Sequence, residues 1–188
     1  MTKARLLWID LEMTGLDPNV DKIIEVAALG TDWDLNPLCE FTATVKVDED
    51  FMKNRMVGKF WEENSESRDA MIAANASGNE TEAVEKSLLE WLDANFAKES
   101  IDDVKSKGKI ILAGNSIHQD RKFIDNEWPN LAKRLHYRML DVSAWKVYFE
   151  GALGKKFVKS EAHRALDDIN GSIAELKWYL SMFKEEDK

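Results

Sequence analysis

The amino-acid sequence predicts the α/β fold class, with a mixed five-stranded sheet flanked by helices. Three strand-like segments stand together near the start of the chain, and two more alternate with segments that have a helical apolar period. Consecutive strand-like segments favour antiparallel neighbours, whereas strands that alternate with helices favour parallel ones. Both patterns in one chain predict a mixed sheet with helices packed on it.

The first three predicted strands cover 6–11, 22–31 and 40–47. The first is an apolar run that ends before the turn sequence Thr14-Gly15-Leu16-Asp17-Pro18. A short apolar run bounded by turn residues is typical of a buried strand. A polar loop around residues 32–37 separates the second strand from the third, and this short connection predicts an antiparallel meander.

Most of the remaining chain has the three- and four-residue apolar spacing of amphipathic helices. The clearest example follows Thr81, a candidate N-cap, and has Val84, Leu88, Leu92 and Phe96 on one face. The other expected elements are helices near 62–74 and at 117–127, 143–149 and 163–183, strands at 109–113 and 137–141, a charged connection at 98–107 and a loop at 151–160. We expect Trp128-Pro129 to break the helix at 117–127, because a proline disrupts the hydrogen bonding inside a helix.

The composition predicts one soluble domain over residues 1–188, in which 184–188 form a solvated tail. A chain of 188 residues can bury about 70% of its unfolded surface in a single core. Its longest apolar runs are far shorter than the roughly 20 residues that cross a bilayer, and Asp10 interrupts the apolar region that a signal peptide would need. We therefore expect a cytoplasmic location and no membrane partner.

The charge balance argues against one class of partner. The 26 basic and 35 acidic residues give a net charge of −9. This charge disfavours binding to duplex DNA, because long-range attraction to a duplex depends on a surplus of Lys and Arg. A nucleic-acid enzyme with this charge needs bound divalent cations to supply positive charge locally.

Two acidic residues close the first predicted strand. Asp10 and Glu12 are two residues apart, so their side chains point to the same face of the strand. An isolated Asp-x-Glu pair is often no more than a solvated strand end, and this interpretation stays open from the pair alone. The apolar strand that leads to the pair favours a functional role.

Three further residues stand at the starts of helices. Asp120 lies in the first turn of the helix expected at 117–127, and His163 and Asp168 lie at the start of the last helix. The expected apolar stripe of that helix consists of Leu166, Ile169, Ile173, Leu176, Leu180 and Phe183. Asp168 lies nearer to this stripe than Asp167 does, so Asp168 is the better candidate ligand. An acid in the first turn commonly stabilises or caps the helix, and this remains the alternative for both acids.

Four segments of the sequence carry a pattern that is found in one known family. They are Trp8-Ile9-Asp10-Leu11-Glu12-Met13-Thr14-Gly15-Leu16, Gly114-Asn115-Ser116-Ile117 with Asp120, His136-Tyr137-Arg138 with Leu140-Asp141-Val142-Ser143, and Ala162-His163-Arg164-Ala165-Leu166-Asp167-Asp168-Ile169. In this order they resemble the oligoribonuclease family of the DEDDh exonuclease superfamily. The resemblance implies a ribonuclease-H-like fold, a homodimer, and 3′→5′ hydrolysis of short RNA, chiefly dinucleotides, to 5′-mononucleotides.

The same resemblance implies roles for the acids and the histidine. Asp10, Glu12, Asp120 and Asp168 would hold two divalent cations, Mg²⁺ or Mn²⁺, and His163 would be the general base. Hard cations prefer carboxylate oxygen, and two ions ~3.5–4 Å apart can stabilise both the attacking and the leaving oxygen of a phosphodiester. A neutral imidazole can accept a proton at cytoplasmic pH.

Six further residues would bind the substrate by this resemblance. Leu16 and Trp61 would wedge and stack the two bases, and Tyr137 and Arg138 would reach in from the other subunit. Ser116, Arg138 and Ser143 would cap the 5′-phosphate and so reject longer RNA. Each residue alone allows a simpler role, because isolated aromatic residues often fill a core or an interface and serines often occupy turns and N-caps. The segment 62–67 departs from the Asn-, Thr- and His-containing segment that is usual in the family.

Two other functions remain compatible with the sequence. A sister DEDDh exonuclease would act on RNA tails or longer single strands, and a non-catalytic RNA-binding or dimerisation module could keep the same fold. A module without turnover has no use for clustered carboxylates that repel each other. The set of four acids and one histidine therefore favours an enzyme.

Overall fold

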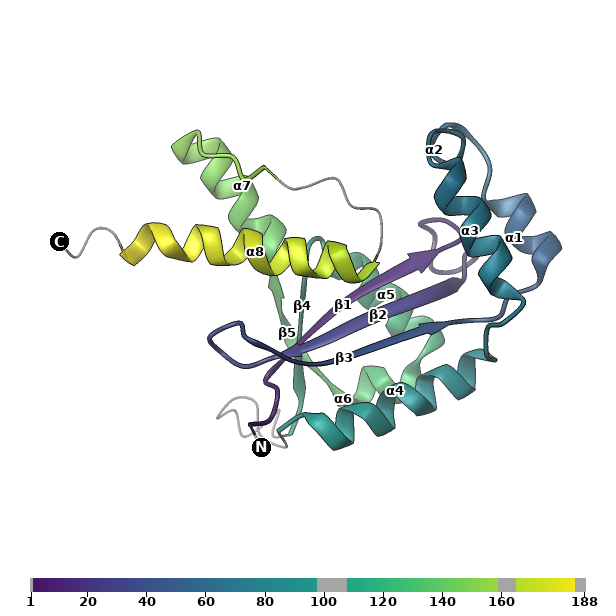
Figure 1. The fold of residues 1–188 in the computed structure, drawn as a ribbon, viewed down its shortest axis with the longest axis horizontal. Coiled ribbons are helices and arrows are strands. Elements are labelled where there is room, and N and C mark those ends of the chain that lie inside the picture. The colour runs from purple at the N-terminus through teal and green to yellow at the C-terminus, as the bar shows by residue number, and fades with distance from the viewer. Residues whose placement is uncertain (1, 98–107, 159–164, 185–188) are drawn as a thin grey trace.

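A five-stranded sheet in the order β3-β2-β1-β4-β5 runs through the middle of the protein (Figure 1). The computed structural model describes residues 2–97, 108–158 and 165–184. The strands are β1 (Leu6–Met13), β2 (Ile23–Thr31), β3 (Pro37–Thr44), β4 (Ile110–Gly114) and β5 (Leu135–Asp141). The strand pairs β1–β2 and β2–β3 are antiparallel, and the pairs β1–β4 and β4–β5 are parallel. The predicted mixed five-stranded sheet is therefore confirmed.

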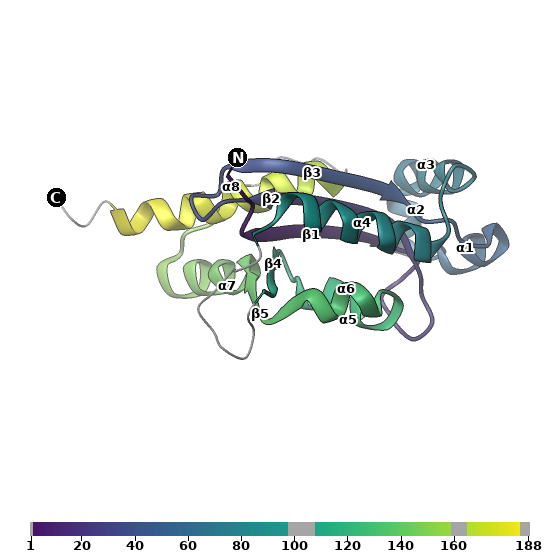
Figure 2. The same ribbon diagram turned by 90° about the horizontal axis from the view of Figure 1, so that it is seen from below.

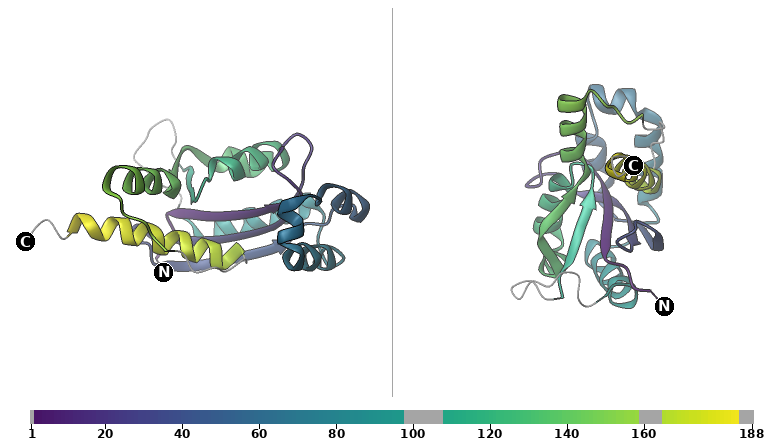
Figure 3. Two further views of the ribbon diagram at one scale, coloured as in Figure 1. Left: turned by 90° about the horizontal axis from the view of Figure 1, so that it is seen from above. Right: turned by 90° about the vertical axis from the view of Figure 1, so that its left-hand side faces the viewer.

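Helices cover both faces of the sheet and one of its ends. They are α1 (Glu49–Arg55), α2 (Lys59–Glu63), α3 (Ser65–Asn75), α4 (Thr81–Asn95), α5 (His118–Glu127), α6 (Pro129–Arg134), α7 (Val142–Leu153) and α8 (Ala165–Lys184). The group α4, α5 and α6 lies on one side of the sheet and the pair α7 and α8 on the other (Figure 1, Figure 2). The short helices α1, α2 and α3 gather beyond the end of β1, as the view from above in Figure 3 also shows. Within the described ranges no helix is long and apolar enough to span a membrane.

Alternate residues of β1 face two separate cores. Leu7, Ile9 and Leu11 pack in the core that α4, α5 and α6 cover. Leu6 and Trp8 pack in the second core, under α7 and α8. Because side chains alternate along a strand, Asp10 and Glu12 continue the face of Leu6 and Trp8. The two acids thus emerge on the α8 side of the sheet, where the apolar part of that face ends.

The third strand differs from its prediction at both ends. It runs from Pro37 to Thr44 rather than from 40 to 47. β3 is an edge strand, and Pro37 is its first residue, so the missing backbone N–H of the proline breaks no essential ladder bond. Past Thr44 the chain gains another neighbour, because Val45 forms an isolated bridge with Asn79 while its N–H still donates to Ile24 of β2.

Two helical predictions also need correction. Trp128-Pro129 ends α5 as expected, but a second helix, α6, starts at Pro129, since proline is well suited to the first turn of a helix. In α8, Leu180 and Phe183 are 36% and 56% exposed, although they were expected in the buried stripe. The buried residue in this part of α8 is Tyr179, and the end of the helix projects past the sheet (Figure 1). The predicted start of this helix at His163 lies outside the described residues.

Candidate active site

The end of β1 extends beyond its parallel neighbour. β1 pairs with β4 only from Leu6 to Trp8, and its remaining residues continue past the last pair. On this open side the backbone N–H of Leu11 donates a hydrogen bond to Oδ1 of Asp120, 3.0 Å away. The bond joins residues that are 109 positions apart, and it fixes Asp120 beside the Asp10–Glu12 pair.

Asp120 lies in the first turn of α5, as expected from the sequence. It is 8% exposed. Burial raises the pKa of Asp120 to about 7, and the hydrogen bond from Leu11 only partly opposes this rise. A carboxylate with so little solvent needs positive charge or further donors to stay ionised at neutral pH.

Asp168 lies in the first turn of α8 and is half-buried, whereas Asp167 is exposed. The predicted orientation of Asp168 toward the sheet is therefore confirmed. Ser172 holds this turn, because its hydroxyl donates to the carbonyl oxygen of Asp168 at 2.9 Å. Asn115, at the end of β4, in turn donates through Nδ2 to Ser172 Oγ at 2.9 Å and to Glu175 Oε2 at 3.2 Å. The end of β4 thus positions the helix that carries Asp168.

Glu12 interacts electrostatically with three other acids. Burial raises the pKa of Glu12 to about 7, and the negative charges of Glu25, Asp168 and Asp120 add to the rise. Carboxylates from β1, β2, α5 and α8 therefore share one electrostatic environment. Within the described residues, however, no three acid, His or Cys side chains come close enough to form a ready-made metal cluster.

Glu25 was not identified from the sequence. It pairs with Glu12 across the β1–β2 ladder, and directly paired residues of an antiparallel ladder point to the same face. Only the register of the two strands could have identified it, and the sequence gives no such register. The predicted base, His163, lies outside the described residues.

Ser116 and Ser143 lie together, just after the ends of β4 and β5. The backbone N–H of Ser116 donates to Ser143 Oγ at 2.9 Å and to Asp141 Oδ1 at 3.0 Å, and the two hydroxyl oxygens are 3.1 Å apart. Ser116 has a φ of 50°, a left-handed conformation that few residues other than glycine adopt. The N-cap of α7 is Asp141 rather than Ser143, since its side chain accepts from Ser143 N at 2.9 Å. The result is a pair of hydroxyls in a fixed position, of which Ser116 is exposed and Ser143 half-buried.

Leu16 projects from the loop between β1 and β2, and 74% of it is exposed. Its carbonyl oxygen accepts a hydrogen bond from Nε2 of Gln119 in α5, at 2.8 Å. Gln119 precedes Asp120 in the same helical turn. The loop that presents Leu16 is therefore tied to the helix that presents a predicted metal ligand.

A buried carboxylate closes the same loop. Asp21 is 1% exposed and accepts hydrogen bonds from Thr14 Oγ1 and Asp17 N, each at 3.0 Å. Arg55 of α1 donates to both oxygens of Asp21, at 2.8 and 3.0 Å. Burial alone raises the pKa of Asp21, but the hydrogen bonds from Arg55, Asp17 and Thr14 outweigh burial and hold the pKa below its usual range. Gly15 is required here, because an added Cβ would lie 2.5 Å from Asp21 Oδ2.

The remaining predicted substrate residues lie on α2 and on β5. Trp61 is only 8% exposed and packs in a third small core with Ile24, Met52 and Met56, so little of its ring is available in this conformation. Tyr137 and Arg138 lie on the edge strand β5. Tyr137 is 64% exposed, and the Arg138 guanidinium lies 5.3 Å from the centre of its ring. The structure does not bring Arg138 to Ser116 and Ser143 of the same chain.

Comparisons with known proteins identify the fold and the family. The family model described as Exonuclease matches residues 7–176. A solved structure of E. coli exonuclease I with single-stranded DNA, in a zinc-bound form, superimposes with a TM-score of 0.62 at 14% sequence identity, over 94% of this chain and 40% of that chain. This chain thus spans two fifths of that enzyme, and the likeness shows the fold, which is ribonuclease-H-like as expected.

Curated proteins are more similar in sequence. The oligoribonuclease of Haemophilus influenzae is 38% identical over 188 residues, which is 98% of this chain and 98% of that protein. The oligoribonuclease of Francisella tularensis is 40% identical over 181 residues, with 93% of each chain covered. The family match over most of the chain and these nearly full-length relatives show that this chain belongs to the oligoribonuclease family of exonucleases.

Proposed function

We propose that this exonuclease releases 5′-mononucleotides from the 3′ end of very short RNA, chiefly dinucleotides, by hydrolysis that depends on two divalent metal ions. One observation supports the proposal most: the Leu11–Asp120 hydrogen bond holds Asp120 at the end of β1 that carries Asp10 and Glu12, and the negative charges of Asp120 and Asp168 act on Glu12. The proposed unit is one exonuclease domain over residues 1–188, and the proposed compartment is the cytoplasm.

The donor set fits hard divalent cations. Exonucleases of this family generally use divalent metal ions, and four carboxylates offer the oxygen ligands that Mg²⁺ and Mn²⁺ prefer. The raised pKa values of Glu12 and Asp120 reflect burial and crowded negative charge, which bound cations would relieve. Asp10, Glu12, Asp120 and Asp168 would hold two such ions. When bound, the ions would stabilise the charge that develops on the phosphodiester oxygens.

The chain's own residues would orient the substrate and move the proton. His163 would accept the proton of the attacking water, since a neutral imidazole is a suitable base near pH 7. Leu16 would separate the two bases, supported by its bond to Gln119. Trp61 would stack on a base, which requires its ring to become more exposed than the present 8%. Ser116 and Ser143 would cap the 5′-phosphate, and their hydroxyl pair supports this role.

A second copy of the chain would complete the site. Tyr137 and Arg138 are exposed on β5, which is an edge strand of the sheet, and natural proteins usually cover or block such edges. Apolar side chains of the neighbouring helices α7 and α8 are also exposed, including Val147 at 74% and Tyr148 at 62%. A homodimer through this side would bury both features and bring Arg138 of one copy toward the serine pair of the other.

A substrate-length series tests the proposal. RNAs of two, five and twenty nucleotides are digested with Mg²⁺, with Mn²⁺ and with a chelator, and released mononucleotides are measured. We expect the fastest turnover on the dinucleotide and none with the chelator. Asp10→Asn should abolish turnover, while the exposed control Asp34→Asn should not. Faster turnover on the twenty-nucleotide RNA would instead indicate a sister exonuclease that acts on tails, and activity in the chelator would exclude the metal mechanism.

A further inference from the structure

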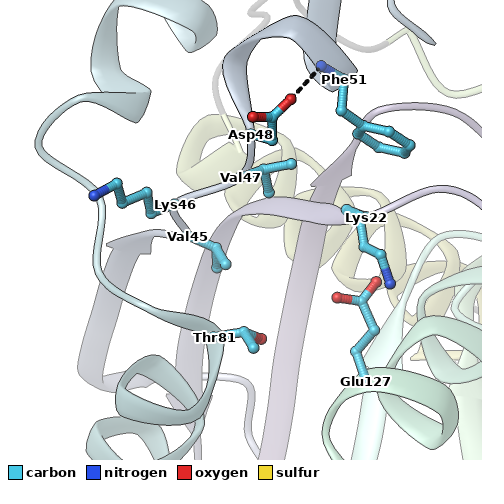
Figure 4. A pocket seen from close by; sticks show the side chains of 8 residues that line it. All are labelled: Lys22, Val45, Lys46, Val47, Asp48, Phe51, Thr81 and Glu127. Atoms are coloured by element: carbon cyan, nitrogen blue, oxygen red, sulfur yellow. Dashed lines mark hydrogen bonds between the residues drawn. The ribbon is translucent and has the colours of Figure 1, made fainter.

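A pocket of about 510 Å³ lies on the α4 and α5 side of the sheet, away from the face of Asp10 and Glu12 (Figure 4). It opens between the start of α1, the start of α4 and the end of α5 (Figure 4). Its lining consists of Lys22, Val45, Lys46, Val47, Asp48, Phe51, Thr81 and Glu127. The volume falls within the roughly 300–1,000 Å³ of small-molecule sites, which combine apolar walls with a few polar groups.

Hydrogen bonds fix the apolar walls of this pocket. Val45 N donates to the carbonyl oxygen of Ile24 at 2.8 Å. Val47 exchanges two hydrogen bonds of 2.8 Å with the side chain of Asn75. Asp48 caps α1 by accepting from Phe51 N at 2.8 Å, the bond drawn in Figure 4. Because the walls are tied to the sheet and to two helices, the pocket is formed before any ligand binds.

One side of the pocket presents a donor next to an acceptor. The ammonium group of Lys22 and the carboxylate of Glu127 point toward each other there (Figure 4). Oε1 of Glu127 accepts from the backbone N–H of Ile23 at 3.2 Å, whereas Oε2 accepts no hydrogen bond from the part of the chain that the structure describes. Burial raises the pKa of Glu127, and the positive charge of Lys22 opposes this rise. The carboxylate is therefore poorly solvated and can accept a further hydrogen bond from a ligand.

We propose that this pocket binds the base of a free 5′-mononucleotide. The ring of Phe51 offers a face for stacking, while Lys22 and Glu127 offer a donor and an acceptor to the edge of the base. A nucleobase is flat and presents donors and acceptors side by side on its edge. Lys46 lies at the opposite rim, 55% exposed and 4.0 Å from Glu80, where it can reach the phosphate.

Guanine fits this edge better than the other bases. Its O6 accepts next to two kinds of N–H donor, on N1 and N2, so O6 can face Lys22 while the N–H groups face Glu127. Adenine and cytosine each have a single amino group to donate on this edge, and uracil has a single ring N–H. Thr81 can add one contact, because its oxygen accepts from Trp128 Nε1 at 3.0 Å and its own proton remains to be donated.

The site is independent of hydrolysis at the acidic edge, so binding is measured in the presence of a chelator. The full-length ¹⁵N-labelled protein is titrated with GMP, AMP, CMP and UMP and followed by NMR. We expect saturable shifts of the Trp128 indole N–H and of the Ile23 and Val47 amides, with the highest affinity for GMP. Failure of the hydrolysis proposal would leave these shifts unchanged.

Two variants and a matched control identify the contacts. Lys22→Gln and Glu127→Gln should each weaken GMP binding about tenfold, the usual effect of losing a charge-assisted hydrogen bond. The glutamine at 127 keeps an oxygen for Ile23 N, so the fold should persist, and Phe51→Leu provides a third test through loss of the ring. Lys133→Gln, on the surface of α6, should bind as the wild type does.

Three results would overturn the proposal. One is the absence of saturable shifts up to about 10 mM mononucleotide. Another is equal GMP affinity in the Lys22, Glu127 and Phe51 variants and in the Lys133 control. The last is a set of shifts confined to Leu11 and Asp120, which would assign all nucleotide binding to the acidic edge.

Discussion

Asn115 joins the end of β4 to α8, and its replacement by alanine should reduce both stability and activity. Its Nδ2 donates to Glu175, which is 4% exposed, and to Ser172, which is 5% exposed. Asn115→Ala removes a longer bond of 3.4 Å that Asn115 Oδ1 accepts from Ser143 Oγ, as well as one hydrogen bond to a charged acceptor and one to a neutral hydroxyl. Bonds of these kinds contribute about 1.5–3 and about 0.5–1.5 kcal/mol. Loss of these two bonds should therefore lower the free energy of unfolding by about 2–4.5 kcal/mol.

The loss should appear in two independent measurements. For a domain of this size each kcal/mol corresponds to ~2–4 °C, so the thermal midpoint should fall by roughly 4–18 °C. Below the transition, kcat on a diribonucleotide should fall at least about tenfold, because Ser172 holds the turn that carries Asp168 and small misplacements of reacting groups are costly. Circular dichroism gives the midpoint, and turnover is measured where the variant is fully folded.

Two further variants make the test specific. Asn170→Ala removes a hydrogen bond to the Leu166 carbonyl on the exposed side of the same helix, and its effect should stay within about 0.5 kcal/mol. Asn115→Asp should be worse than Asn115→Ala at neutral pH, because it sets a second carboxylate against buried Glu175. If Asn115→Ala behaves like Asn170→Ala, or if the aspartate variant is the more stable of the two, the Asn115 link does not position α8.

Three other predictions follow from single contacts. Glu85→Ala should lower the free energy of unfolding, measured with urea, by about 2–4 kcal/mol, because Glu85 accepts three hydrogen bonds from residues 130 and 131 at the start of α6. A loss no larger than that caused by Glu90→Ala, at an exposed position, would contradict this. The pKa of Asp21 is lowered in the folded protein, so on acidification the unfolded chain takes up the proton first. The stabilisation that ionised Asp21 gives above pH ~3.9 is therefore lost as the pH falls through the folded-state pKa. Asp21→Asn should reduce this loss of unfolding free energy at acid pH, and an unchanged pH dependence would refute the role of Asp21. Leu16→Ala should raise KM on the dinucleotide several-fold with the thermal midpoint unchanged, since Leu16 is largely exposed; an unchanged KM would remove Leu16 from the binding site.

Much of the fold followed from local patterns in the sequence. The five strands and the helices after Thr81 were predictable because apolar spacing reports which face of an element is buried. The same spacing predicted that Asp168 is more buried than Asp167, which the structure confirms, whereas the role of Asp168 as a metal ligand stays a prediction. The pattern failed at the end of α8, where Leu180 and Phe183 are exposed. A helix that runs past the sheet keeps its apolar period but has no sheet left to cover it.

Contacts between distant segments could not be predicted. The Leu11–Asp120 bond depends on β1 being longer than its neighbour β4, and no local pattern reports relative strand lengths. Ser116 and Ser143 were equally compatible with a turn and an N-cap, and only the parallel pairing of β4 with β5 brings them together. Glu25 was missed for the same reason, because its position opposite Glu12 is a property of strand register.

The length difference between β1 and β4 also explains how an acidic protein can bind RNA at this edge. Where β4 stops, β1 has lost one neighbour, and the first turns of α5 and α8 bring Asp120 and Asp168 toward it. Helix starts favour negative charge, yet burial still raises the pKa of Asp120 to about 7, so the helix dipole alone does not keep the cluster ionised. The proposed cations would supply the missing charge, and they would do so at the point where a phosphate has to bind. The net charge of −9 then weakens the long-range electrostatic attraction of long duplexes to the protein, but it does not prevent a very short RNA from binding at the metal site.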